Sequence, residues 1–319
     1  MRRLILDVFA ALLLMLAAAA QADGLPDEVL VNDVEFVRIP AGEFQYTVET
    51  NSGHLQPDGP PMYRHVRVWL DEFYLAKYEA RARDQERFMN AGAASPGALA
   101  RLAQEQSEHV AVDRSADPGC TVRRNTAGRY YRPDATQDLP ATNLSWELAV
   151  EFAQWMGFRL PTEAEWEKAA RGPDRRIWPW GNDYPDDTFA LFIWTRSCHP
   201  VPVNAYPKGR SPYGLYNMAG NVSEHVSDWY NTEFDAAFKD GDSKPAPALA
   251  GTPVPFQIPQ KISKGGRWSQ GPAQQAIAAR RLMRPAGAAA SEGVRFALDA
   301  ATVRSHLAQG TARLVKDQP

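Results

Sequence analysis

The sequence predicts a single domain of the α+β class with a low content of regular secondary structure. Strand-like runs of apolar residues come first, at 34–44 and 65–80. Helical periodicity is concentrated in the middle of the chain. Glycine and proline are frequent, with 22 and 25 in 319 residues. No repeat or linker divides the chain and 44% of its residues are hydrophobic, so one sizeable core is expected.

Local signals place the strands and the first helix. Pro40, Gly42 and Asp71 interrupt the apolar runs, so strands are expected to end near them. Apolar residues at three- and four-residue steps predict a helix that ends near Gly157: Trp146, Ala149, Val150, Ala153 and Met156.

A second helix is predicted to follow at once. Thr162 and Glu165 have the spacing of a capping box, and Gly172 with Pro173 ends the helix. The helix carries three carboxylates that are expected to be solvated: Glu163, Glu165 and Glu167.

Two long segments, 91–140 and 235–262, have little periodicity and are expected to be surface loops. From residue 298 onward, Val303, Leu307 and Leu314 form a weak helical pattern, which predicts an appended helix.

The amino terminus has the features of a secretory signal peptide. Arg2 and Arg3 precede an apolar run from Val8 to Ala20, and the run ends in Ala20-Gln21-Ala22. Cleavage after Ala22 would remove residues 1–22. An uncleaved anchor is the alternative, although the run is shorter than the roughly 20 residues that span a bilayer. The mature chain is expected in the periplasm without a transmembrane segment.

Charge and cysteine content narrow the possible partners and chemistry. Lys and Arg number 35 against 38 for Asp and Glu, so no basic field is available to attract nucleic acid. The only cysteines are Cys120 and Cys198, and an oxidising compartment favours a disulfide between them. Two free thiols are the alternative.

Several phrases, in order, resemble the formylglycine-generating enzyme and sulfatase-modifying-factor family. They are FVRIPAGEF, RLPTEAEWEKAARG, PWGN, GLYNMAGN, GGRW and EGVRF. The resemblance implies one α+β domain at 23–319, distantly related to C-type lectins, with a core at about 34–297 and a C-terminal extension at 298–319.

The resemblance also bears on catalysis. In the oxidases of this family, two cysteines after the glycine pair bind copper, and one exchanges with the substrate cysteine. Gln270 and Gln275 occupy the two thiol positions here. Glutamine provides neither a thiolate nor a soft copper ligand, so formylglycine-generating activity is expected to be absent and no catalytic residue is assigned.

Another branch of the family uses iron held by histidines. No two of the six histidines lie within five residues of each other, so an iron site would have to be assembled from distant loops. They are His54, His65, His109, His199, His225 and His306.

One calcium ion with a structural role is expected. The phrase at 217–224 resembles the family's calcium loop, which implies oxygen ligands from Asn217, Gly220, Val222 and Glu224. A turn without metal is the alternative, because Ser223 and His225 stand where the family usually has aromatic residues.

The expected function is a binding role on a scaffold that has lost its redox residues. The chain resembles the family's periplasmic regulator of kinase activation in the type VI secretion threonine-phosphorylation pathway, which implies a protein partner in the periplasm or at a membrane face. The alternative is a periplasmic oxidoreductase resembling the family's siderophore-maturation member. In that case a vestigial pocket of Trp268, Gln270, Gln275 and Arg281 would orient a small molecule.

Overall fold

The computed structural model describes residues 24–49, 63–101, 123–124, 130–131, 137–193, 199–231, 259–288 and 291–315, and the structural statements below concern these parts of the chain. The predicted signal peptide, Cys120, Cys198 and most of the two predicted loops lie outside them. Within the described residues, no helix combines the length and the apolar character needed to cross a membrane.

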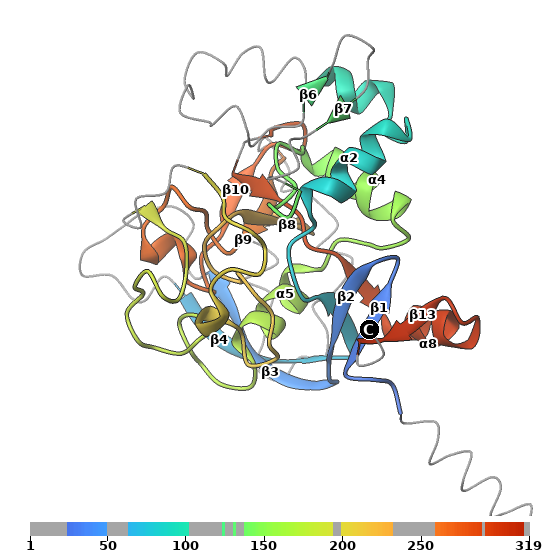
Figure 1. The fold of residues 1–319 in the computed structure, drawn as a ribbon. Helices are drawn as coiled ribbons and strands as arrows, with labels where there is room; N and C mark the ends of the chain where they lie inside the picture. The colour runs from blue at the N-terminus through green and yellow to red at the C-terminus, as the bar shows by residue number, and fades with distance from the viewer. Residues whose placement is uncertain are drawn as a thin grey trace, which may run out of the picture.

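A five-stranded antiparallel sheet joins the two ends of the domain, and its order is β12-β5-β2-β1-β13. Asn32 and Asp33 connect β1 to β2 with φ of 48° and 64°, as a two-residue hairpin turn requires. Figure 1 shows the first strands, in blue, beside the last, in red. The strands are β1 (Glu28–Val31), β2 (Val34–Ile39), β5 (Phe73–Ala76), β12 (Ala297–Asp299) and β13 (Ala312–Leu314).

The C-terminal segment contributes to this sheet. The predicted helix is present as α8 (Ala300–Ala308), and its residue Val303 is buried. After the helix, β13 pairs with β1, with Leu314 opposite Val29. The segment is therefore an edge of the sheet as well as a helix, which the weak periodicity did not indicate.

The remaining strands form a hairpin and two further sheets. β3 (Gly42–Glu49) pairs with β4 (Tyr63–Leu70), and the breaks predicted at Pro40, Gly42 and Asp71 are confirmed. A four-stranded sheet has the order β10-β9-β8-β11, and β6 (Arg123–Arg124) pairs with β7 (Tyr130–Tyr131). The four-stranded sheet consists of β8 (Ser223–Trp229), β9 (Lys261–Lys264), β10 (Arg281–Met283) and β11 (Glu292–Gly293).

Both helices predicted in the middle of the chain are confirmed. The first, α4 (Trp146–Trp155), is followed by Gly157 at φ 82°. The second, α5 (Glu163–Arg171), has the complete capping box between Thr162 and Glu165. Further helical elements are α2 (Ala82–Asn90), a helical stretch at 96–101 and two 3-10 turns, η3 (Pro207–Gly209) and η4 (Pro272–Gln275).

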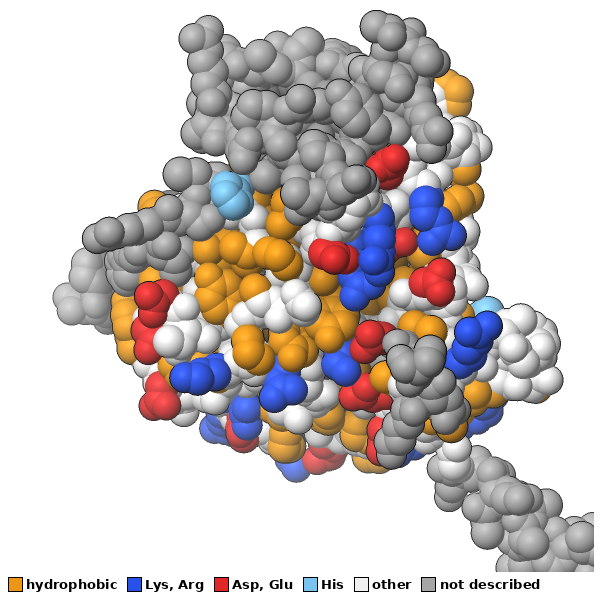
Figure 2. All heavy atoms as spheres, viewed as in Figure 1, with side chains coloured by type: hydrophobic (Ala, Val, Ile, Leu, Met, Phe, Trp, Pro, Cys, Tyr) orange, Lys and Arg blue, Asp and Glu red, His pale blue; other side chains and the backbone are white. Residues whose placement is uncertain are grey.

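Two apolar clusters form the core. One lies between α4 and the five-stranded sheet, where Phe36, Phe152 and Phe296 are fully buried. The other surrounds α5, which packs against β3, β5, β8 and β9 near the centre of the molecule (Figure 1). Acidic and basic side chains are interspersed around a hydrophobic patch on the face shown in Figure 2, so this face carries no large field of one sign.

The expectation that the α5 carboxylates are solvated is wrong for two of them. Glu163 and Glu167 are 1% and 0% exposed. Glu163 accepts from Arg280 Nε at 2.6 Å, Lys264 Nζ at 3.2 Å and Tyr46 Oη at 3.0 Å. Burial opposes its ionisation, but Arg280 and Lys264 lower the pKa of Glu163 to about 2.

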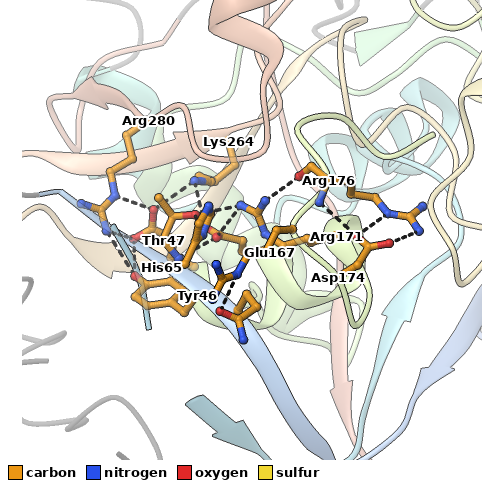
Figure 3. A network of polar contacts seen from close by, with 12 residues as sticks. Tyr46, Thr47, His65, Glu167, Arg171, Asp174, Arg176, Lys264 and Arg280 are labelled. Carbon is orange, nitrogen blue, oxygen red and sulfur yellow. Dashed lines mark hydrogen bonds and ion pairs between the residues drawn. The ribbon is translucent and has the colours of Figure 1, made fainter. Parts of the chain in front are cut away.

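Glu167, one helical turn after Glu163, belongs to the same network of buried charges. Its Oε1 accepts from the Thr47 amide and from Arg171 Nη2, each at 2.8 Å, and Lys264 Nζ lies 3.6 Å from Oε2. The network links α5 to β3, β9 and the residue before β10 (Figure 3). Two carboxylates that look like surface charges are therefore part of the interior.

Replacing Glu163 by Gln is expected to destabilise the fold by about 3–5 kcal/mol, because the buried charges of Arg280 and Lys264 would lose the carboxylate that they share. The matched control is Glu72→Gln, since Glu72 pairs with Arg304 at the surface, where a pair contributes about 0–1 kcal/mol. Urea unfolding of both variants gives the comparison. Equal losses in the two variants would show that the buried network does not stabilise the fold.

Candidate functional site

The segment at the two predicted thiol positions is a tight turn that follows β9. Gly265 and Gly266 have φ of 87° and 66°, and a Cβ on Gly266 would lie 2.6 Å from the Gln274 carbonyl oxygen. Only glycine fits such a position. A backbone hydrogen bond joins the turn to the segment just before β8: the Trp268 amide donates to the Asn221 carbonyl at 2.9 Å.

Gln275 stabilises this turn from inside. Its side chain is fully buried, and Nε2 donates to the carbonyls of Leu191 at 3.0 Å, Arg267 at 3.2 Å and Gln270 at 3.4 Å. The amide thus joins three backbone positions in two segments. The vestigial pocket stays a prediction, and the structure adds that Gln275 contributes three contacts to backbone carbonyls.

The other three predicted pocket residues remain partly exposed. The Trp268 Nε1 and Gln270 Oε1 atoms are buried and have no hydrogen-bond partner in the described structure. Arg281, on β10, forms an ion pair with Glu292 on β11. The structure therefore brings Gln270 and Gln275 together. It pairs Arg281 with Glu292, a residue that the sequence did not indicate as part of a site.

One face of the four-stranded sheet collects polar side chains. Strand register places His225 opposite Ser263, Ser263 opposite Arg281, and Ser223 opposite Glu292. Ser223, His225, Ser263 and Glu292 are all at most 1% exposed. Four of their atoms have no partner among the described residues: Ser223 Oγ, His225 Nδ1, Ser263 Oγ and Glu292 Oε2.

This polar face was not predicted as a site. The one sequence signal was the presence of Ser223 and His225 at positions where the family usually has aromatic residues. Buried polar atoms without partners are uncommon in native proteins and point to water or a ligand between them.

A backbone carbonyl orients the His225 ring. Its Nε2 lies 3.0 Å from the Leu144 carbonyl oxygen, which only accepts, so Nε2 carries a proton, and in the neutral ring Nδ1 is an acceptor. Burial lowers the pKa of His225, and Arg281 lowers it further, whereas Glu292 and the Leu144 carbonyl raise it.

The predicted calcium loop is a chain of tight turns that begins after residue 216. Asn217, Gly220 and Asn221 have φ of 51°, 79° and 60°. A Cβ on Gly220 would lie 2.3 Å from the Leu191 carbonyl oxygen. Asn217 donates through Nδ2 to Glu79 Oε2 at 2.9 Å and to the Val203 carbonyl at 3.0 Å, which leaves its Oδ1 buried without a partner.

Glu224 is held firmly by protein groups. Its Oε2 accepts from Trp166 Nε1 at 2.6 Å and from Arg295 Nε at 2.9 Å, and its Oε1 accepts from Arg295 Nη2 at 2.5 Å. A carboxylate offers about four lone-pair positions, and three are used here. Of the two predicted side-chain ligands, Asn217 presents a free oxygen, whereas Glu224 has little capacity left.

Glu79 is a second carboxylate in this region, and the sequence did not indicate it. It is 2% exposed, and its Oε2 accepts from both Asn217 and Asn221 while Oε1 has no partner. Burial raises the pKa of Glu79 to about 8, with a further increase from Glu224 and an opposing effect from Arg295.

These donors fit a hard cation. Asn217 Oδ1 and Glu79 Oε1 are both buried oxygens without partners, and oxygen is the ligand type that calcium requires. Within the described residues, no three His, Cys, Asp or Glu side chains are grouped so as to hold a metal ion. A site here therefore depends on the Asn amide and on backbone carbonyls as well as on carboxylates.

Comparison with known proteins identifies the family. Residues 23–300 match the model of the Sulfatase-modifying factor enzyme 1-like domain, and the chain belongs to this family. Among the similar proteins is the Formylglycine-generating enzyme of Mus musculus, 33% identical over 228 residues, which are 61% of this chain and 58% of that protein. The chain therefore matches little more than half the length of that enzyme.

Two further similarities are informative. The Serine/threonine-protein kinase Pkn1 of Chlamydia trachomatis is 29% identical over 267 residues, which cover 83% of this chain and 38% of the kinase. The solved structure of PvdO from Pseudomonas aeruginosa superposes with a TM-score of 0.59 at 21% identity, over 86% of this chain and 99% of PvdO. The second similarity shows a shared fold.

Acidification is expected to destabilise the protein through His225. Its folded pKa lies below that of the unfolded chain, so the unfolded state binds the proton first as the pH falls. Stability from this group is complete above about pH 6.5 and decreases below it, by at most about 1.4 kcal/mol per pH unit.

The measurement is urea unfolding at pH 7.5, 6.5 and 5.5 for the parent and for His225→Gln. Other titrating groups contribute to both proteins and cancel in the difference. The variant should lose less stability than the parent on acidification, and parallel pH profiles would contradict the assignment.

Proposed function

We propose that this protein is an exported, non-catalytic member of the family that acts in the periplasm by binding another protein. The observation that carries the proposal is the pair Gln270 and Gln275 at the thiol positions. Copper binding and thiol exchange both need thiolates, and glutamine has no equivalent chemistry. Gln275 is also used as a buried brace of three carbonyls, so the position serves the structure.

The proposed partner is a component of a kinase pathway. The chain resembles TagR, the periplasmic regulator in the type VI secretion threonine-phosphorylation pathway, and we propose the same role, promotion of kinase activation through protein contacts. The similarity to Pkn1 supports a link with kinases, because a segment like this chain forms 38% of a protein named as a serine/threonine kinase. Loops on a rigid scaffold are suited to such recognition.

Deleting the gene is expected to reduce kinase-dependent threonine phosphorylation, and a plasmid copy should restore it. A copy with Gln270→Ala should restore it equally, because the proposed role needs no chemistry at that position. Phosphoproteomic comparison of the four strains measures the effect. Unchanged phosphorylation after deletion would refute the regulatory role.

Calcium is proposed as a structural cofactor of the loop at 217–224. Asn217 would contribute its free side-chain oxygen, Gly220 and Val222 their carbonyls, and Glu224 its remaining lone pair. The bound ion would hold three tight turns together and neutralise part of the buried negative charge.

Glu224→Gln is expected to weaken calcium binding by at least tenfold, because the carboxylate contributes charge as well as an oxygen. Isothermal titration of metal-free parent and variant gives the affinities, and circular dichroism before the titration checks that the variant has folded despite its altered contact with Arg295. Equal affinities would remove Glu224 from the ligand set.

The second candidate function is a periplasmic oxidoreductase similar to PvdO. The unpaired atoms on the polar face of the four-stranded sheet favour it, because they would accept a small polar molecule near Arg281. Metal analysis of protein from the native host separates the candidates. Stoichiometric iron or copper would favour the oxidoreductase, and calcium without either metal would favour the regulator.

A further inference from the structure

The polar face of the four-stranded sheet is spanned by one ion pair. Arg281 lies on β10 and Glu292 on β11, which are the outer strands of the order β10-β9-β8-β11. Neighbouring strands are about 4.8 Å apart, so roughly 14 Å separate the two backbones. The two side chains nevertheless form an ion pair, so both must reach inward over the central strands β8 and β9.

Smaller side chains lie beneath this ion pair. The strand register places Ser263 beside Arg281 and Ser223 beside Glu292, with each pair on the same face of the sheet. His225 follows Ser223 on this face, two residues further along β8 and opposite Ser263. The Arg281 side chain is 31% exposed and that of Glu292 is 0% exposed, so Arg281 covers this face toward the solvent.

The enclosed groups need hydrogen-bond donors. Glu292 Oε2 and, in the neutral ring, His225 Nδ1 can only accept, and both are buried without a partner among the described residues. The hydroxyls of Ser223 and Ser263 also have no partner there, so neither of them donates to these acceptors. Buried polar atoms are rarely left in this state, which points to a molecule between them that brings several N–H or O–H groups.

A primary ammonium group meets these requirements best. Its three N–H donors are enough for Glu292 Oε2, His225 Nδ1 and one serine hydroxyl. It also carries a positive charge, which a buried carboxylate needs whenever its partner leaves. Arg281 can leave, because its side chain already reaches the solvent. Water supplies only two donors and no charge, and it is the competing occupant.

We propose that the polar face is a binding site for the primary ammonium group of a small molecule, held by Glu292, His225 and a serine hydroxyl. Arg281 covers the empty site, and the ligand takes its place on Glu292. The site is independent of calcium and of a protein partner, so it goes beyond the regulatory role. It also names a ligand class for the face that the second candidate function uses, although binding itself requires no redox step.

Two cations of equal charge give the first comparison. Methylammonium has three N–H donors and tetramethylammonium has none, so only methylammonium can supply the missing donors. The full mature chain is titrated with each chloride salt at pH 7.5 and constant ionic strength. Binding is followed by the ring nitrogen resonances of His225, which are assigned by their loss in His225→Gln.

Two variants should change the affinity in opposite directions. Glu292→Gln removes the charge and should weaken methylammonium binding by at least about tenfold, the usual effect of losing a charged hydrogen bond. Arg281→Ala removes the competing guanidinium and should strengthen binding by about the same factor. Arg304→Ala is the matched control, because Arg304 pairs with Glu72 at the surface, and its affinity should equal that of the parent. Circular dichroism checks that each variant has folded.

The outcomes separate an ammonium site from a face that holds only water. Saturable shifts with methylammonium alone, and opposite effects of the two variants, support the inference. If neither the parent nor Arg281→Ala responds to methylammonium, the inference is overturned. An equal response to both cations would be a general salt effect and would overturn it as well. If Arg281→Ala does not fold, the parent and Glu292→Gln still give the decision.

Discussion

Buried charge on helix α5 is the constraint on which the hairpin and the four-stranded sheet depend. Glu163 and Glu167 face inward and are matched by Arg280, Lys264 and Arg171. Between them, Trp166 donates to Glu224 on β8. One short helix therefore supplies partners to the hairpin and to the four-stranded sheet. Because each buried charge needs its partner, these elements are held in one arrangement more specifically than apolar packing alone would require.

The turn that contains Gln270 and Gln275 is held in shape by a buried side-chain amide. A thiol pair would leave reactive groups at this turn, whereas Gln275 offers an amide that holds three carbonyls in two segments. The glycines at 220 and 266 remain, because backbone from neighbouring segments approaches them too closely for any side chain. The geometry of the turn therefore depends on close backbone approach and on the Gln275 amide.

Local signals predicted most of the secondary structure. Caps, glycines and prolines within a few residues determine the ends of α4 and α5 and the breaks near Pro40 and Asp71. These features can therefore be predicted from the sequence. The pairing of β13 with β1 was not predicted, since it joins residues almost 300 positions apart through backbone groups that every residue carries. The burial of Glu163 was missed for the same reason: its partners lie more than 100 residues away in sequence.

The sequence by itself determined the family and the order of the elements, because motif spacing does not require knowledge of distant contacts. Only the tertiary structure decided which polar groups are paired. Glu224 matches the family's calcium motif, yet it shares its oxygens with Arg295, and Glu79 has no local motif but faces Asn217. In a protein interior the role of a carboxylate is set by its neighbours, and those neighbours come from segments that only the fold brings together.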